Sequence, residues 1–175
     1  RVIALVEGNS SSAKELSERA PDAKIYKTWQ EAVNDPDVDL IDICLPDNLH
    51  YEVAKAALLA GKHVFCEKPL ADTAQEAREL ADIAREKGLI TRVGHAFPRN
   101  PVHDLAKKLI DAGEIGDLFY YDSARTNLGL FQRDCNVIWD LAPHDFSIMN
   151  YIVGKRAKSV RAMGADHAGR GFADI

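Results

Sequence analysis

The chain has 175 residues, 46% of them hydrophobic and 28% charged, and its formal net charge at pH 7 is -5. This composition is typical of a folded globular protein, and the interspersed acidic and basic residues argue against a nucleic-acid footprint or a polybasic membrane contact. No apolar run approaches the roughly 18 residues that a membrane helix needs.

Short apolar runs and amphipathic stretches alternate over the first half of the chain. The apolar runs predict strands at residues 2–6, 24–27, 38–45, 63–66 and 89–93. The stretches between them predict helices at residues 12–20, 28–33, 48–60 and 73–87. Ser12 with Glu15, and Thr73 with Glu76, fit the capping box of a helix start. This order with short links predicts an α/β fold, a doubly wound parallel sheet with helices on both faces.

The pattern changes after Gly94-His95, and we place a domain boundary near Phe97-Pro98. The first domain then covers residues 1–97, and the second, of α+β type, covers residues 98–175. In the second domain we expect helices at residues 102–109 and 140–153 and strands at residues 117–126 and 159–163. Pro143 is tolerated without cost only in a first helical turn, so the last helix should begin close to Asp140.

This last helix carries a carboxylate and an imidazole four residues apart. Asp140 and His144 share one helical face with Ser147 and Tyr151. The positive end of the helix dipole lies near Asp140 and favours its ionised form beside His144. The same spacing also suits a capping aspartate and an ordinary interface histidine, because short motifs occur by chance.

Glu67-Lys68-Pro69 follows the predicted strand at residues 63–66, at the sheet edge where open α/β sheets bind ligands. Pro69 keeps the backbone of Lys68 out of the helical region and is able to fix it through a cis bond. A lysine at this place is also a common solvated flank. We expect one pocket to contain Lys68, Asp140 and His144. Together these three side chains would be able to transfer a proton while a hydride is transferred to or from a nucleotide cofactor.

Glu7 ends the first predicted strand. In nucleotide-binding folds an acidic residue after the second strand binds the ribose hydroxyls, although a turn acid looks the same in sequence. The glycine fingerprint of such folds is absent, so it would lie upstream of Arg1 if residues 2–6 are the second strand. Glu7, with no arginine at residues 8–11, predicts NAD over NADP, because a 2′-phosphate would meet a carboxylate.

The three cysteines, Cys44, Cys66 and Cys135, are widely spaced and form no Cys-x-x-Cys pair. We therefore expect no metal site. Free cysteines of this kind suit a reducing compartment, and the chain opens on a strand without a signal-peptide pattern. We expect a cytoplasmic protein.

Several segments together resemble one enzyme family. They are Pro46-Asp47-Asn48 with His50, residues 57–64 leading into Glu67-Lys68-Pro69, Gly94-His95, Asn100-Pro101, residues 113–116, and Asp140 with His144-Asp145. The chain resembles, over essentially its whole length, the glucose–fructose oxidoreductase / inositol dehydrogenase (Gfo/Idh/MocA) family. The resemblance implies a fragment that lacks the N-terminal glycine-rich loop and the C-terminal part.

The resemblance also implies an activity and a set of site residues. Members have a Rossmann domain followed by a substrate domain on a large antiparallel sheet, bind NAD or NADP, and oxidise or reduce carbon–oxygen centres of sugars and cyclitols. Lys68 would contact the reacting oxygen, His144 would be the acid/base and Asp140 its partner. Pro46, His50, Glu67 and Lys68 would line the nicotinamide side.

Residues 125–129 and 136–145 look most like the corresponding segments of family members that act in nucleotide-sugar and surface-polysaccharide pathways. In such members a polar substrate would contact four side chains: Arg125, Asn127, Arg133 and Asn136. The alternative is that these are ordinary solvated loop residues. The family's open sheet face implies a homo-oligomer, a dimer or a tetramer.

Two other functions stay open at this point. A catalytically silent nucleotide-binding or regulatory module would keep the same fold. A metal hydrolase built on Asp140 and His144 would need further ligands that the sequence does not supply.

Overall fold

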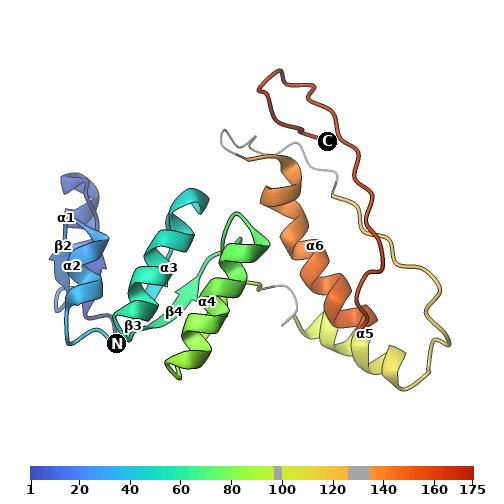
Figure 1. Ribbon diagram of the computed structural model, residues 1–175, viewed down its shortest axis with the longest axis horizontal. Helices are drawn as coiled ribbons and strands as arrows, with labels where there is room; N and C mark the ends of the chain where they lie inside the picture. Colours follow the sequence, from blue (N-terminus) through green and yellow to red (C-terminus); the bar gives the residue numbers. More distant parts are fainter. Residues whose placement is uncertain (97–99, 126–134) are drawn as a thin grey trace. The chain divides into compact units, whose positions relative to one another are not determined.

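The structure, a computed structural model, describes residues 1–96, 100–125 and 135–175. The chain forms two compact units, residues 1–94 and residues 95–175, which run from blue to green and from yellow to red in Figure 1. The predicted boundary at Phe97 and Pro98 falls in a stretch outside the described residues.

The first unit alternates strands and helices in the predicted order (Figure 1). Its strands are β1 (Ala4–Val6), β2 (Lys24–Tyr26), β3 (Leu40–Ile43), β4 (His63–Cys66) and β5 (Thr91–Val93). Its helices are α1 (Ser10–Arg19), α2 (Trp29–Asn34), the 3-10 turn η1 (Asp47–Leu49), α3 (His50–Leu59) and α4 (Ala74–Glu86). Strand β1 pairs with β2, and β3, β4 and β5 form a second ladder in that order, all parallel. The predicted α/β class with parallel strands is confirmed.

Local side-chain hydrogen bonds decide where the helices begin. The predicted capping box of α4 is present, with Thr73 Oγ1 accepting from the Glu76 N–H and the Glu76 carboxylate accepting from the Thr73 N–H. The predicted start of α1 at Ser12 is wrong. Asn9 Oδ1 accepts from the Ser11 N–H at 2.9 Å, so the capping residue lies three positions earlier, at Asn9.

The core of the first unit lies between α3, α4 and the three-stranded sheet. Its largest fully buried hydrophobic members are Ile43, Val53, Leu58, Val64, Cys66 and Leu80. Burial raises the pKa of the Cys66 thiol to about 12, which keeps the thiol protonated. Cys66 thus behaves as a small buried hydrophobe, while Cys44 is exposed.

A buried carboxylate ties β2 to the turn before β3. Asp35 is only 5% exposed, and its Oδ2 accepts hydrogen bonds from Lys24 Nζ and from the Tyr26 hydroxyl, each at 2.9 Å. The backbone N–H of Asp37 donates to the other oxygen. Lys62 Nζ binds the carbonyl of Asp35 at 2.8 Å. Opposite charge and hydrogen bonding compensate for the burial of this group.

The second unit contains two helices, α5 (Pro101–Asp111) and α6 (Val137–Val153), among its described residues. They pack against each other, and the Tyr151 hydroxyl of α6 donates to Asp104 of α5 at 2.6 Å. Ile148 and Ile152 are the buried residues of α6. These two isoleucines lie one turn apart and place an apolar part of α6 in the interior of the unit.

Two predicted strands do not form. Residues 117–125 and 159–163 are described, and neither segment is a strand. Their aromatic and branched side chains are largely exposed, with Phe119 at 92% and Val160 at 84%. A strand exists only when a neighbouring strand receives its hydrogen bonds, and sequence pattern alone does not supply that partner.

Helix α6 begins at Val137, earlier than the start near Asp140 that was predicted from the position of Pro143. Asn136 Oδ1 accepts from the N–H groups of Ile138 and Trp139 and fixes the start at Val137. Pro143 consequently lies in the second turn. It has no N–H to donate to Trp139, and one hydrogen bond of the helix is lost there.

The helices among the described residues are all too short or too polar to cross a bilayer.

Candidate active site

The polar residues of the first unit gather where three neighbouring parallel strands end. The segment Leu45-Pro46 follows β3, Glu67-Lys68-Pro69 follows β4, and Gly94 follows β5. Two further ladder bonds hold these ends together, from the Glu67 N–H to the Ile43 carbonyl and from the Gly94 N–H to the Cys66 carbonyl. The carboxyl edge of a parallel sheet is the usual place for a ligand in α/β proteins.

Lys68 stands in the middle of this edge. The Lys68-Pro69 peptide is cis, Pro69 is buried and Lys68 is half-buried. The Lys68 N–H donates to Glu67 Oε2 at 3.3 Å. The carboxylate of Glu67 lies over Gly94, where a Cβ atom would stand only 3.0 Å from Oε1. Lys68 and the carboxylate that accepts from its backbone N–H thus lie on adjacent residues at the end of β4.

His50 is the first residue of α3 and is completely buried. Its Nδ1 lies 2.6 Å from the carbonyl oxygen of Pro69, and its Nε2 lies 2.8 Å from the carbonyl oxygen of Leu45. Both ring nitrogens face the backbone of the two turns, and the ring is enclosed among the described residues. The place of His50 on the nicotinamide side stays a prediction. Pro46, in contrast, is exposed.

Glu7 lies at the end of β1, on the other sheet of the same unit. Its N–H donates to the Tyr26 carbonyl at 3.0 Å and continues the ladder with β2. Its Oε1 accepts from the Asn9 N–H at 2.8 Å and orders the loop before α1. Within the described part of the chain, Oε2 receives no hydrogen bond.

Asp140 and His144 lie in the first half of α6. Both are half-buried, and helical geometry places side chains four residues apart on one face. The Asp140 N–H donates to the Asn136 carbonyl at 3.1 Å, and the Ser147 hydroxyl donates to the His144 carbonyl at 2.7 Å. The backbone that carries the pair is thus regular helix from its cap onward.

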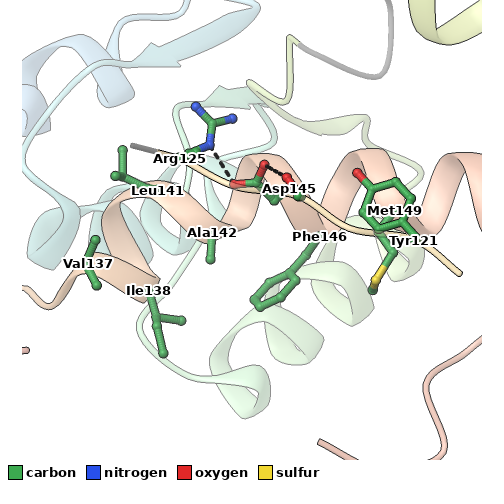
Figure 2. A pocket seen from close by; sticks show the side chains of 10 residues that line it. Tyr121, Arg125, Val137, Ile138, Leu141, Ala142, Asp145, Phe146 and Met149 are labelled. Carbon is green, nitrogen blue, oxygen red and sulfur yellow. Dashed lines mark hydrogen bonds and ion pairs between the residues drawn. The ribbon is translucent and has the colours of Figure 1, made fainter. Parts of the chain in front are cut away.

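Asp145 follows His144 in α6, and its side chain binds Ser123 and Arg125 (Figure 2). Its Oδ1 accepts from the Ser123 hydroxyl at 2.7 Å and its Oδ2 from Arg125 Nε at 2.6 Å. Burial alone would raise the pKa of Asp145, but the bonds from Ser123 and Arg125 lower it below its ordinary value. A carboxylate is therefore favoured here.

This ion pair borders a hollow of about 350 Å³ in the second unit (Figure 2). Apart from Ser123, Arg125 and Asp145, the wall is apolar or aromatic: Tyr121, Val137, Ile138, Leu141, Ala142, Phe146 and Met149. Sequence reasoning gave Asp145 no role of its own. The only signal was its place beside His144, which puts it on a different helical face.

The four residues predicted to contact substrate lie in different places. Arg125 lies at the hollow, with its Nε bound to Asp145. Asn136 uses its side-chain oxygen to cap α6. Asn127 and Arg133 lie outside the described residues. Among the predicted site residues, the structure brings together Pro46, Glu67 and Lys68 in the first unit, and Asp140 and His144 in the second.

Each group has a clear chemical capacity. An ammonium next to strand ends stabilises a developing negative charge on oxygen. An imidazole with a carboxylate on the same helical face transfers protons near neutral pH.

The chain matches two family models that follow one another along it. Residues 1–95 match the model described as "Oxidoreductase family, NAD-binding Rossmann fold", and residues 103–174 match the "GFO/IDH/MocA C-terminal domain". The first match alone covers more than half of the chain.

Named proteins show the same relationship. Levoglucosan dehydrogenase of Pseudarthrobacter phenanthrenivorans is 34% identical over 164 residues, 86% of this chain and 42% of that protein. The scyllo-inositol 2-dehydrogenase (NADP(+)) of Bacillus subtilis is 37% identical over 112 residues, 64% of this chain and 31% of that protein. A solved levoglucosan dehydrogenase in complex with NADH and levoglucosan has a TM-score of 0.74 at 32% identity and covers 87% of this chain and 45% of that chain.

The chain thus spans less than half the length of these relatives. The order of its elements, its strand-end residues and both family models agree, and the chain belongs to the GFO/IDH/MocA family of oxidoreductases.

Proposed function

We propose that the protein to which this chain belongs is a nicotinamide-dependent dehydrogenase that oxidises a hydroxyl of a sugar or cyclitol, or reduces the corresponding ketone. The observation that carries the proposal is Lys68, held at the carboxyl edge of the parallel sheet of a chain that matches an NAD-binding Rossmann family model. The named dehydrogenases among its relatives act on such polyols, which supports the substrate class.

The residues of the first unit suit a dinucleotide. Glu7 ends its strand with one carboxylate oxygen still able to accept a hydrogen bond from a ribose hydroxyl. Pro46 and Glu67 are exposed at the sheet edge, where the nicotinamide end would be held. Glu7 also favours NAD, because a 2′-phosphate would lie against its negative charge, while the NADP(+) enzyme among the relatives keeps NADP as the second choice.

In the proposed oxidation, His144 takes the proton of the substrate hydroxyl as the C–H bond of the same carbon breaks. When bound, the nicotinamide cofactor accepts the hydride that leaves this carbon. The Lys68 ammonium stabilises the negative charge that develops on the oxygen before the carbonyl forms. Asp140 supports the protonated form of His144. In the reduction, His144 returns the proton to the oxygen.

Finer features of the proposal concern the substrate and the cell. A nucleotide sugar is among the substrates to be tried, because Arg125 carries a guanidinium that suits phosphate or carboxylate. We also propose a cytoplasmic homo-oligomer, a dimer or a tetramer.

Turnover by the full-length protein tests the proposal. The assay follows reduced nicotinamide by absorbance with NAD or NADP and a panel of monosaccharides, levoglucosan, inositols and nucleotide sugars. We expect turnover with at least one polyol and its loss in His144→Ala. Tight NAD binding without turnover on any member of the panel would instead identify a catalytically silent nucleotide-binding module.

A further inference from the structure

His50 is a buried polar side chain that the proposed chemistry does not use. Its exposed fraction is 0%. Its two hydrogen-bonding partners lie outside its own helix, on the carbonyls of Leu45 and Pro69, five and 19 residues away in the chain. One imidazole thus connects the turn after β3 with the turn after β4.

Each of the two turns contains a proline: Pro46 follows Leu45 in the first turn, and Pro69 follows Lys68 in the second. Proline has no N–H, so Pro46 and Pro69 are unable to anchor their turns by donating a backbone hydrogen bond. Carbonyl oxygens that point into a core need a donor, because an unsatisfied buried carbonyl destabilises the folded state. The His50 ring nitrogens lie 2.6 Å and 2.8 Å from one carbonyl oxygen of each turn. A ring N–H donates to one of these carbonyls, and the tautomer decides which.

We propose that His50 is a positioning residue that holds the Glu67-Lys68-Pro69 turn, and with it the Lys68 ammonium, in its working place. This inference rests on the proposed function, because it assigns His50 an effect through Lys68. The carbonyl that His50 binds belongs to the residue directly after Lys68, so a shift of Pro69 is carried into the Lys68 backbone within one peptide unit.

The alternative is an ordinary core histidine whose loss only lowers stability. Helix α3 offers a matched control for this alternative, because Val53 is also buried, at 1% exposure, and lies one turn from His50 on the same helix. Val53→Ala opens a cavity in the core and leaves both carbonyl contacts of His50 in place. His50→Phe keeps a ring in the core and removes both ring nitrogens, and with them any hydrogen bond to the Leu45 and Pro69 carbonyls.

The first measurement compares steady-state kinetics of full-length His50→Phe and Val53→Ala. We expect His50→Phe to lower kcat at least about 10-fold with NAD affinity nearly unchanged, since misplacing a reacting group by about 1 Å costs up to about 100-fold. Val53→Ala should keep kcat within about twofold at a comparable loss of melting temperature. His50→Gln, which retains one amide donor, should recover part of the lost kcat and serves in place of His50→Phe if that variant does not fold.

The second measurement is a double-mutant cycle with Lys68→Ala. If His50 acts through Lys68, adding His50→Phe to Lys68→Ala should lower kcat by less than about threefold more, although it costs far more in the wild-type background. Full, multiplicative loss in the double variant, or normal kcat in both His50 variants, overturns the positioning role while the proposed function stands. Normal kcat in Lys68→Ala itself overturns the proposed function and this inference together.

Discussion

The carboxylate of Glu67 lies directly over the backbone of Gly94, with Oε1, Cδ and Oε2 all 3.0–3.1 Å from where a Cβ atom of residue 94 would be. Glu67 precedes Lys68, and Gly94 ends the neighbouring strand β5. The absence of a side chain at residue 94 therefore decides where the acidic neighbour of Lys68 is placed.

Gly94→Ala should displace the Glu67 side chain without unfolding the protein, because an exposed flexible carboxylate yields more easily than backbone. We expect kcat/KM to fall about 10-fold with an unchanged melting temperature. In a Glu67→Ala background the same substitution should have no further effect. Gly8→Ala is the control, because its Cβ would meet only the Lys27 carbonyl oxygen at 3.9 Å. Unchanged kcat/KM in Gly94→Ala would remove Glu67 placement from the account.

Asp35 should make the first unit acid-sensitive. Hydrogen bonds from Lys24, the Asp37 N–H and Tyr26 hold the pKa of Asp35 at about 2, below its ordinary value of 3.8. The stabilisation is present above the unfolded pKa and is lost as pH falls through the folded pKa, so it should fade from about pH 4 to about pH 2.

Hydrogen exchange of the amides of β2 and β3 measures this effect locally. Protection should decrease in the wild type over that pH range, whereas Asp35→Asn should be less protected at neutral pH and change less with acid. Asp82→Asn is the control, because its ion pair with Arg85 is exposed. Identical acid profiles for wild type and Asp35→Asn would contradict the assignment.

The Arg125–Asp145 ion pair should stabilise the second unit more than a surface pair does. Its side chains are 32% and 20% exposed, so water screens it less than the exposed pairs that contribute about 0.2–1 kcal/mol. A double-mutant cycle with Arg125→Ala and Asp145→Ala, followed by urea unfolding, should give a coupling energy of about 1 kcal/mol or more.

The matched control is the Arg19–Glu15 pair, which has the same 2.6 Å separation but side chains 75% and 65% exposed. Its coupling energy should be close to zero. Equal coupling in the two cycles would show that the partial burial of Asp145 has no energetic effect.

Glu7 should set the choice between NAD and NADP. Glu7→Ala removes a charged acceptor for the ribose hydroxyls, and such a hydrogen bond contributes about 1.5–3 kcal/mol, or roughly 10- to 100-fold in affinity. NAD should therefore bind more weakly and NADP more tightly in the variant, as measured by calorimetry. Glu15→Ala, on the exposed surface of α1, should change neither affinity. Tighter binding of NADP than NAD by the wild type would contradict this role.

Where local chemistry determines an element, the sequence was sufficient to predict it. Thr73 and Glu76 specify the start of α4 within four residues. The start of α1 was missed because Asn9 and three serines compete as caps, and Asn9 Oδ1 forms the bonds. The strands predicted at residues 117–126 and 159–163 failed for the opposite reason, since a strand depends on a partner that local pattern does not contain.

In the candidate site, too, local sequence predicted some features and missed those that depend on long-range contacts. The position of Lys68 at a sheet edge follows from the apolar run before it and from Pro69 after it. The true contacts of His50 join residues as far as 19 positions apart, and the Asp145–Arg125 pair spans 20. Such contacts depend on how the elements pack, and no local periodicity encodes them.

The most direct test of the account is steady-state kinetics of Lys68→Ala and His144→Ala in the full-length protein. Each substitution should lower kcat about 100-fold or more, while NAD affinity stays nearly the same. General acid–base assistance by His144 contributes about 10²–10⁴ in rate, and loss of one group that stabilises a developing oxyanion costs about 10²–10³. Near-normal turnover in both variants would contradict the proposed roles of the ammonium and the imidazole.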